Sequence, residues 1–128
     1  MKRFDFAFDP RFRLPLTAIG VRPGSARVLV TPKLLDVRFG PWRLQTSRDN
    51  VRDARRTGPY KVVKAIGPRG SAVDGGVTFG TNAQGGVCIR FHEPVGALLG
   101  RRWFLHPGLT VTVADCDGLI EALDVTSA

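Results

Sequence analysis

LTVTV at residues 109–113, followed by DCDGLIEAL at residues 115–123, decides the fold of this chain. Apolar and polar residues alternate through the first five positions, which is the pattern of a half-buried strand. Asp115 is a good N-cap for the helix that the second stretch predicts. The apolar face of this helix consists of Leu119, Ile120 and Leu123. We therefore predict that the chain ends in a strand and one helix over residues 115–124.

The rest of the sequence is rich in strand patterns and turn signals. Leu35, Val37 and Phe39, for example, alternate with polar residues. Turn signals recur about every 8–12 residues, a spacing typical of an antiparallel sandwich or barrel. Strands are expected over residues 4–8, 14–18, 26–31, 33–39, 42–46, 60–66, 77–79, 87–91 and 109–113. The sequence predicts one mainly β domain over residues 1–128, a bent antiparallel β-barrel or sandwich of about seven strands capped by the C-terminal helix.

Four segments have less regular patterns. Residues 47–56 favour a strand or irregular structure, and the glycine-rich residues 67–76 favour a loop. Residues 82–86 carry a hairpin signal that would join the two strands on either side of them. Residues 93–106 show no clear period.

Basic residues are concentrated in the first half of the chain. The net charge of the protein is +8. Residues 1–64 hold fifteen Lys or Arg and five Asp, a net charge of +10, whereas residues 65–128 hold four and six, a net charge of −2. Such a patch attracts phosphate-rich partners. The alternative is an ordinary solvated face, since Arg outnumbers Lys fifteen to four. The expected anion-binding residues are Arg52, Arg55, Arg56, Lys61 and Lys64, with Arg101 and Arg102.

Location is predicted from hydropathy and cysteine content. No apolar run approaches the roughly 20 residues that span a bilayer. Asp5 and Asp9 interrupt the N-terminal segment where a signal peptide would be apolar. Two cysteines fit a reducing compartment. We expect a cytoplasmic protein, with a peripheral position at the inner face of the membrane as the second expectation.

Catalytic and metal-binding motifs are weak. Cys88, His92, His106 and Cys116 include the ligand types of a zinc site, but the last two are ten residues apart, unlike the close pairs of zinc signatures. The glycines match neither a dinucleotide fingerprint nor a phosphate loop. We predict no enzyme activity, no metal and no cofactor.

The segment 97–105 combines apolar bulk with two adjacent arginines. Leu98, Leu99 and Trp103 are candidate interface residues, because Trp and Arg are frequent at protein interfaces and can also meet a lipid surface. The alternative is that these side chains complete the core or cover an edge of the sheet.

The order of elements resembles that of a bacterial pleckstrin-homology-like domain. The resemblance is carried by residues 34–42 as an early hairpin, residues 50–54 as a middle segment, and residues 109–123 as the last strand and helix. It implies a bent barrel of about seven strands closed by the helix. No residue role follows from it, because fold alone does not determine function.

Together these patterns predict a non-enzymatic binding or scaffolding module. Its expected partner is a protein or an anionic lipid surface. The alternative is a nucleic-acid-binding β-barrel, which is less favoured because RNA-recognition motifs are absent. The sequence carries no signal for an oligomeric state.

Overall fold

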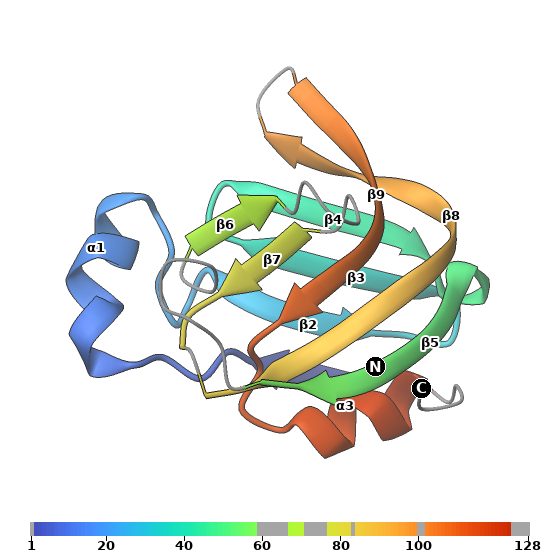
Figure 1. Cartoon of the computed structure of the whole chain (residues 1–128), viewed down its shortest axis with the longest axis horizontal. Helices are drawn as coiled ribbons and strands as arrows, with labels where there is room; N and C mark the ends of the chain where they lie inside the picture. Colours follow the sequence, from blue (N-terminus) through green and yellow to red (C-terminus); the bar gives the residue numbers. More distant parts are fainter. Residues whose placement is uncertain (1, 59–66, 71–76, 83, 100–101, 124–128) are drawn as a thin grey trace.

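The computed structural model describes residues 2–58, 67–70, 77–82, 84–99 and 102–123 (Figure 1). The described part is mainly β and ends in a helix, as predicted. Its elements in chain order are β1 (Lys2–Asp5), η1 (Pro10–Phe12), α1 (Arg13–Ala18), β2 (Ala26–Val30), β3 (Leu34–Phe39), β4 (Trp42–Ser47), η2 (Arg48–Asn50), β5 (Val51–Thr57), β6 (Gly67–Gly70), β7 (Val77–Gly80), β8 (Gly86–Leu99), β9 (Arg102–Val111) and α3 (Cys116–Leu123).

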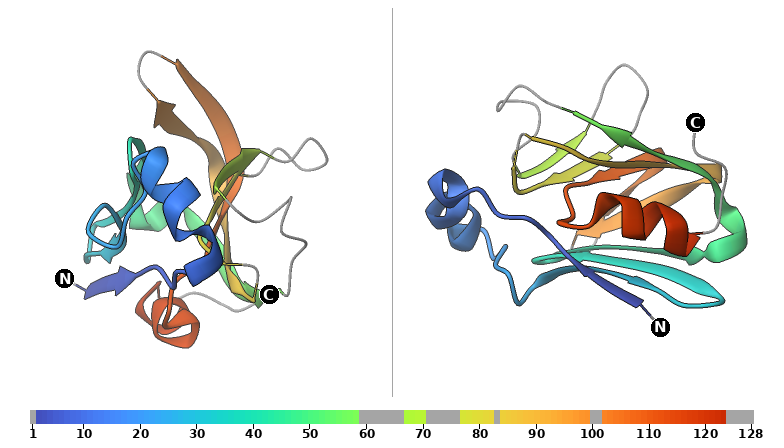
Figure 2. Two further views of the ribbon diagram at one scale, coloured as in Figure 1. Left: turned by 90° about the vertical axis from the view of Figure 1, so that its left-hand side faces the viewer. Right: turned by 90° about the horizontal axis from the view of Figure 1, so that it is seen from below.

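Two layers of sheet share the long strands β8 and β9 (Figures 1 and 2). Strands β1 to β4 form an antiparallel meander, and β4 joins the second half of β8 through the pair Arg43 and Leu98. The first half of β8 pairs with β5 instead. The β8–β9 register shifts between Arg90 and Val95, and such an irregularity lets a strand bend. The two halves of β8 can therefore serve different layers.

The sheet of the described residues is not a closed barrel. The chain after β1 meets the chain after β9 at one isolated bridge, between Phe6 and Val113. Two backbone hydrogen bonds flank it, from Ala7 N to Thr112 O (3.0 Å) and from Ala114 N to Asp5 O (2.9 Å). The sheet is also not purely antiparallel, because β7 pairs with β9 in parallel. The prediction of an antiparallel arrangement throughout is therefore wrong at this strand pair.

The core lies between the layers and follows the alternation of the strands. Leu35, Val37 and Phe39 are buried on β3, as the sequence predicts. The ring of Phe39 stacks on that of Phe79 from β7, with centroids 5.0 Å apart and planes 3° apart. Phe6 packs against the same ring at 5.4 Å. One aromatic side chain thus connects both layers and the N-terminal segment.

Helix α3 packs against β5 and β8 and lies along one open side of the two layers (Figure 2). Asp115 caps it, since its Oδ1 accepts a hydrogen bond from Gly118 N at 3.0 Å. Leu119 and Leu123 are buried, and Ile120 is half-buried against the core. The predicted helix and its apolar face are confirmed within the described residues.

The strand predicted over residues 14–18 is wrong, because this segment forms α1. The strand was expected from the alternation of Leu14, Leu16 and Ala18, with Pro15 placing it at a sheet edge. Pro15 is instead the third residue of the helix, where a backbone N–H has no partner within the helix, so its missing donor costs no hydrogen bond. Leu16 is the one buried residue of this helix.

The predicted hairpin of residues 77–91 is also wrong. Strand β7 pairs with β6 and β9 and not with β8. Asn82 Oδ1 accepts hydrogen bonds from Gln84 N and Gly85 N, so the side chain stabilises a local turn between the strands. Residues 67–70 of the predicted loop form β6. The strand predicted over residues 60–66 lies outside the described residues.

Candidate anion-binding face

The outward side of the β1–β4 layer carries a row of three arginines. Arg27 on β2 lies directly opposite Arg38 on β3, and Arg38 lies directly opposite Arg43 on β4. Side chains directly opposite each other point to the same face, and neighbouring strands are about 4.8 Å apart. We call these three residues the arginine row. Its three positive charges lie within a span of about 10 Å, twice the strand spacing.

Two acidic side chains lie beside the row, Asp5 on β1 and Asp36 two residues before Arg38 on the same face of β3. Asp5 is on the edge strand β1, where it lies opposite Arg27 and forms an ion pair with Arg3. Asp36 accepts hydrogen bonds from Nε and Nη2 of Arg43, at 3.1 and 3.0 Å, and this contact raises the pKa of the Arg43 guanidinium. Arg38 is exposed and has an arginine on each neighbouring strand. The middle of the row therefore has no carboxylate directly opposite it.

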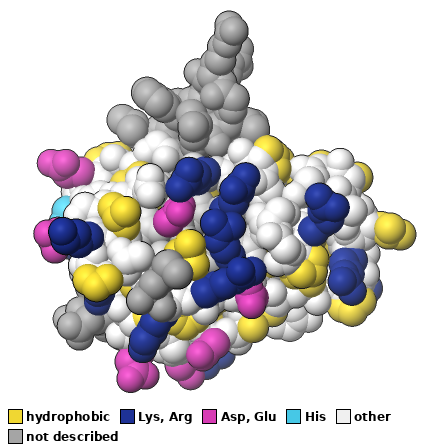
Figure 3. Space-filling view, turned by 180° about the vertical axis from the view of Figure 1, so that it is seen from behind, with side chains coloured by type: hydrophobic (Ala, Val, Ile, Leu, Met, Phe, Trp, Pro, Cys, Tyr) yellow, Lys and Arg dark blue, Asp and Glu magenta, His cyan; other side chains and the backbone are white. Residues whose placement is uncertain are grey.

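Figure 3 shows Lys and Arg side chains gathered in a band on the face seen from behind, with acidic side chains at its edges. Like charges directly opposite each other on a sheet destabilise it. The contacts of Arg38 with Arg27 and Arg43 are therefore unfavourable in themselves, and the ion pair of Arg43 with Asp36 offsets part of this repulsion. Guanidinium groups offer several N–H donors in a planar fork that suits phosphate and carboxylate groups.

The density of basic residues along the chain does not indicate this face, because its three arginines are far apart in the sequence. The one local signal for it is the Gly40-Pro41 turn, since a two-residue turn there places Arg38 opposite Arg43. The position of Arg27 depends in addition on the register of β2 against β3.

The predicted anion-binding residues on β5 are split between two faces. Arg52 and Arg55 are exposed, and Arg55 lies opposite Cys88 on the outward side of the second layer. Arg56 points to the other side, because successive side chains alternate, and its Nη1 lies 3.4 Å from the carboxylate of Asp117 on α3. Adjacent positions on a strand cannot share one binding face.

For the other predicted binding and interface residues, the structure describes at most the backbone. Lys61, Lys64 and Arg101 lie outside the described residues. Leu98 pairs with Trp103, and Leu99 with Arg102, in the β8–β9 ladder. The described residues of the segment 93–106, which shows no clear period in the sequence, therefore belong to the β8–β9 hairpin.

An ion pair occupies the outward face of the second layer. Arg90 donates from Nε to Asp53 Oδ1 at 2.7 Å, and its Nη2 contacts Asp53 Oδ2. The Arg90 hydrogen bond lowers the pKa of the largely buried Asp53 carboxyl, which burial alone would raise. This carboxylate neutralises part of the charge that Arg52 and Arg55 bring to β5.

Cys88, His92, His106 and Cys116 do not form a common metal site in the described structure. No group of three or more His, Cys, Asp or Glu side chains suited to a metal occurs among the described residues. The thiol of Cys116 donates to Val113 O at 3.4 Å, and burial raises its pKa. His92 is exposed on β8. Cys116 is therefore a protonated core residue.

Comparisons with known protein families, with curated proteins and with solved structures find no match to this chain. Across the ranges that the structure describes, no helix has the length and apolar character needed to cross a membrane.

Proposed function

We propose that this protein is a non-enzymatic binding module that attaches to an anionic lipid surface through the arginine row. The observation that carries the proposal is the direct alignment of Arg27, Arg38 and Arg43 on three adjacent strands. The alignment is unfavourable for the isolated protein and favourable for a surface of many phosphates.

The composition of the face favours lipid over nucleic acid. Outward positions on β1 to β4 carry no aromatic side chain, and Trp42 lies on the inward side against the core. A platform for stacking bases is therefore missing from these four strands. Leu29 and the 40% exposed Leu34 add apolar surface to the face, which suits the interface of a bilayer.

The same proposal includes a pleckstrin-homology-like fold. Bent strands shared by two layers and a C-terminal helix along the open side support it. The parallel pair β7–β9, the helix α1 and nine described strands in place of about seven are departures from the expected pattern.

Flotation with vesicles tests the proposal. Each cation near an anionic surface contributes about 1 kcal/mol, so exchanging the whole row for Gln should weaken binding about 100-fold. The variant is Arg27→Gln, Arg38→Gln and Arg43→Gln together. Its matched control, Arg13→Gln with Arg52→Gln and Arg55→Gln, removes the same charge from exposed positions elsewhere and should retain most of the affinity.

Three outcomes contradict the proposal. The wild type fails to float with vesicles rich in anionic lipid at low salt, or the two triple variants lose affinity equally. In the third outcome, the protein binds duplex or single-stranded nucleic acid in a gel-shift titration more tightly than it binds the vesicles at equal salt. That result would make the arginine row a nucleic-acid-binding face.

A further inference from the structure

A groove of about 580 Å³ opens where four parts of the chain meet. These are the chain after β1, the end of β5, the turn between β7 and β8, and the chain leading into α3. The groove is not part of the face that carries the arginine row. Its volume is in the range of small-molecule sites.

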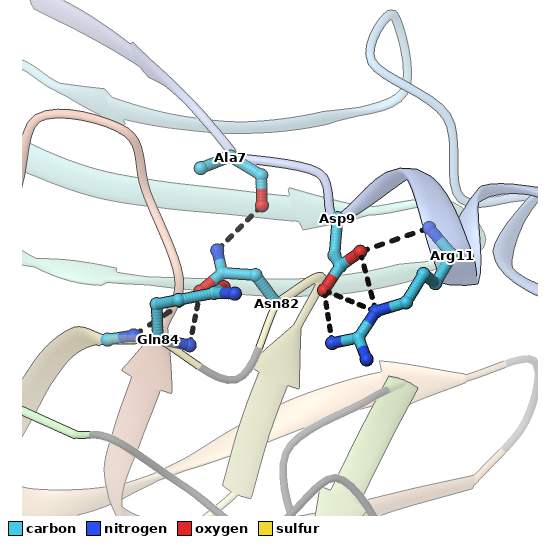
Figure 4. A network of polar contacts seen from close by, with 6 residues as sticks. Ala7, Asp9, Arg11, Asn82 and Gln84 are labelled. Carbon is cyan, nitrogen blue, oxygen red and sulfur yellow. Dashed lines mark hydrogen bonds and ion pairs between the residues drawn. The ribbon is translucent and has the colours of Figure 1, made fainter.

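One wall of the groove is fixed by a polar network (Figure 4). Asn82 Nδ2 donates to Ala7 O at 2.7 Å, while its Oδ1 accepts from Gln84 N at 3.0 Å. Asp9 N donates to Thr81 O at 3.0 Å. The chain after β1 is thereby tied to the turn after β7, and the wall is formed before any ligand arrives.

Arg11 stands at the rim on this wall. Its Nε and Nη2 donate to the carboxylate of Asp9, the shortest contact being 2.9 Å, and its backbone N–H donates to Asp9 Oδ1 at 3.0 Å (Figure 4). These bonds lower the pKa of the Asp9 carboxyl, so the pair stays ionised. The Arg11 side chain is 69% exposed, and the fork that holds it leaves further N–H donors for a second acceptor.

Apolar atoms line much of the remaining groove. Phe8, Val113 and Ala114 contribute side chains, and Cys116 contributes a thiol that burial keeps protonated. No ionised carboxylate stands on this part of the lining.

Arg56 stands at the groove on its other side. Its contact with Asp117 is long, at 3.4 Å, and both side chains are mostly exposed. Such exposed pairs contribute little stability. A ligand anion can therefore replace Asp117 on Arg56 without a large penalty.

We infer that this groove binds a small amphipathic anion, with the apolar body against Phe8, Val113 and Ala114 and the acidic group between Arg11 and Arg56. Asp9 and Asp117 balance the charge of the two arginines, and the match to such a molecule lies in the N–H donors that Arg11 and Arg56 still offer at the rim beside the apolar lining. The inference does not depend on the lipid-binding proposal.

The probe is 8-anilinonaphthalene-1-sulfonate, which has an aromatic body and one sulfonate. Its fluorescence titration is compared with that of N-phenyl-1-naphthylamine, which has the same body and no charge. Arg56→Gln should weaken sulfonate binding at least tenfold, the factor for one charge-assisted hydrogen bond, and leave the neutral probe unchanged. Asp117→Asn frees Arg56 and should tighten sulfonate binding about threefold.

Ala114→Trp places a large side chain in the groove from an exposed position and should abolish binding of both probes. The triple variant of the arginine row should bind both probes as the wild type does. The inference is overturned if Arg56→Gln and Ala114→Trp bind the sulfonate with wild-type affinity, or if only the row variant loses it. A failure of vesicle flotation leaves these titrations unaffected, so the two proposals are tested separately.

Discussion

Truncation of Phe39 to Ala should remove a large part of the stability of the fold. The ring is fully buried and lies against Trp42 of its own layer, Phe79 of the second layer and Phe6 of the N-terminal segment. Loss of a buried Phe costs about 3–5 kcal/mol, and a domain of this size is stable by about 5–15 kcal/mol. We expect the free energy of unfolding to fall by about 4 kcal/mol and Tm by about 10–20 °C.

The measurement is equilibrium urea unfolding followed by tryptophan fluorescence, with an unchanged m value as the sign that both states keep their compactness. Phe39→Leu keeps most of the apolar volume and loses the stacking, so it should cost about 1–2 kcal/mol. A double-mutant cycle with Phe79→Leu should give a coupling energy of about 0.5–1.5 kcal/mol. A loss below 1 kcal/mol for Phe39→Ala, or additive effects at the two rings, would refute the packing of the layers through this pair.

Three further perturbations separate the contributions of the helix, a turn and an ion pair. Leu119→Ala should cost about 2–5 kcal/mol and Ile120→Ala clearly less in urea unfolding, because only the first side chain is fully buried; equal losses contradict the orientation of α3. Gly40→Ala should cost at least about 1–2 kcal/mol, since Gly40 has φ +60° and a Cβ there would lie 2.8 Å from Gly20 O, whereas Gly24→Ala, with open space, should be nearly neutral. The carboxyl of Asp53 has a folded-state pKa below its ordinary 3.8, so its contribution to stability is present above that pH and is lost as the pH falls through the folded value. Asp53→Asn should therefore reduce the loss of unfolding free energy on acidification. An unchanged dependence of this free energy on pH in the acid range would contradict the role of the Asp53–Arg90 ion pair.

Local patterns predicted the strands whose pairing is also local. Leu35, Val37 and Phe39 alternate within one strand, and the turn after Phe39 brings the next strand back beside it, so period and pairing agree. The C-terminal helix follows from its own cap and apolar face, with no information from the rest of the chain. In both cases the physical cause lies within about ten residues.

The errors occur where distant segments decide the structure. The parallel pairing of β7 with β9 joins Val77 to Leu109, and no local turn signal indicates it. Residues 93–106 show no clear period because β8 shifts its register against β9 between Arg90 and Val95, and its two halves then pair with β5 and with β4. Residues 14–18 form a helix where the alternation predicts a strand, because a proline is tolerated in the first turn of a helix and the local pattern does not show where a helix begins.

The candidate face was missed for a related reason. Arg27, Arg38 and Arg43 are far apart in the sequence, and only the register of three strands aligns them. The residues that are dense in the sequence are instead divided, since Arg55 and Arg56 alternate across one strand. Charge density along a chain predicts a binding face only when the periodicity of the element is applied to it.

Environment-sensitive labels on two opposite faces test the central claim most directly. An NBD fluorophore is attached to Gln45→Cys, which points outward on β4 beside the arginine row, or to Arg55→Cys on the second layer. Both are made in a background with Cys88→Ser and Cys116→Ala. The account predicts that anionic vesicles increase the fluorescence of the label at position 45 and leave the label at position 55 unchanged. An increase at position 55 alone, or none at either position while the protein is bound, contradicts it.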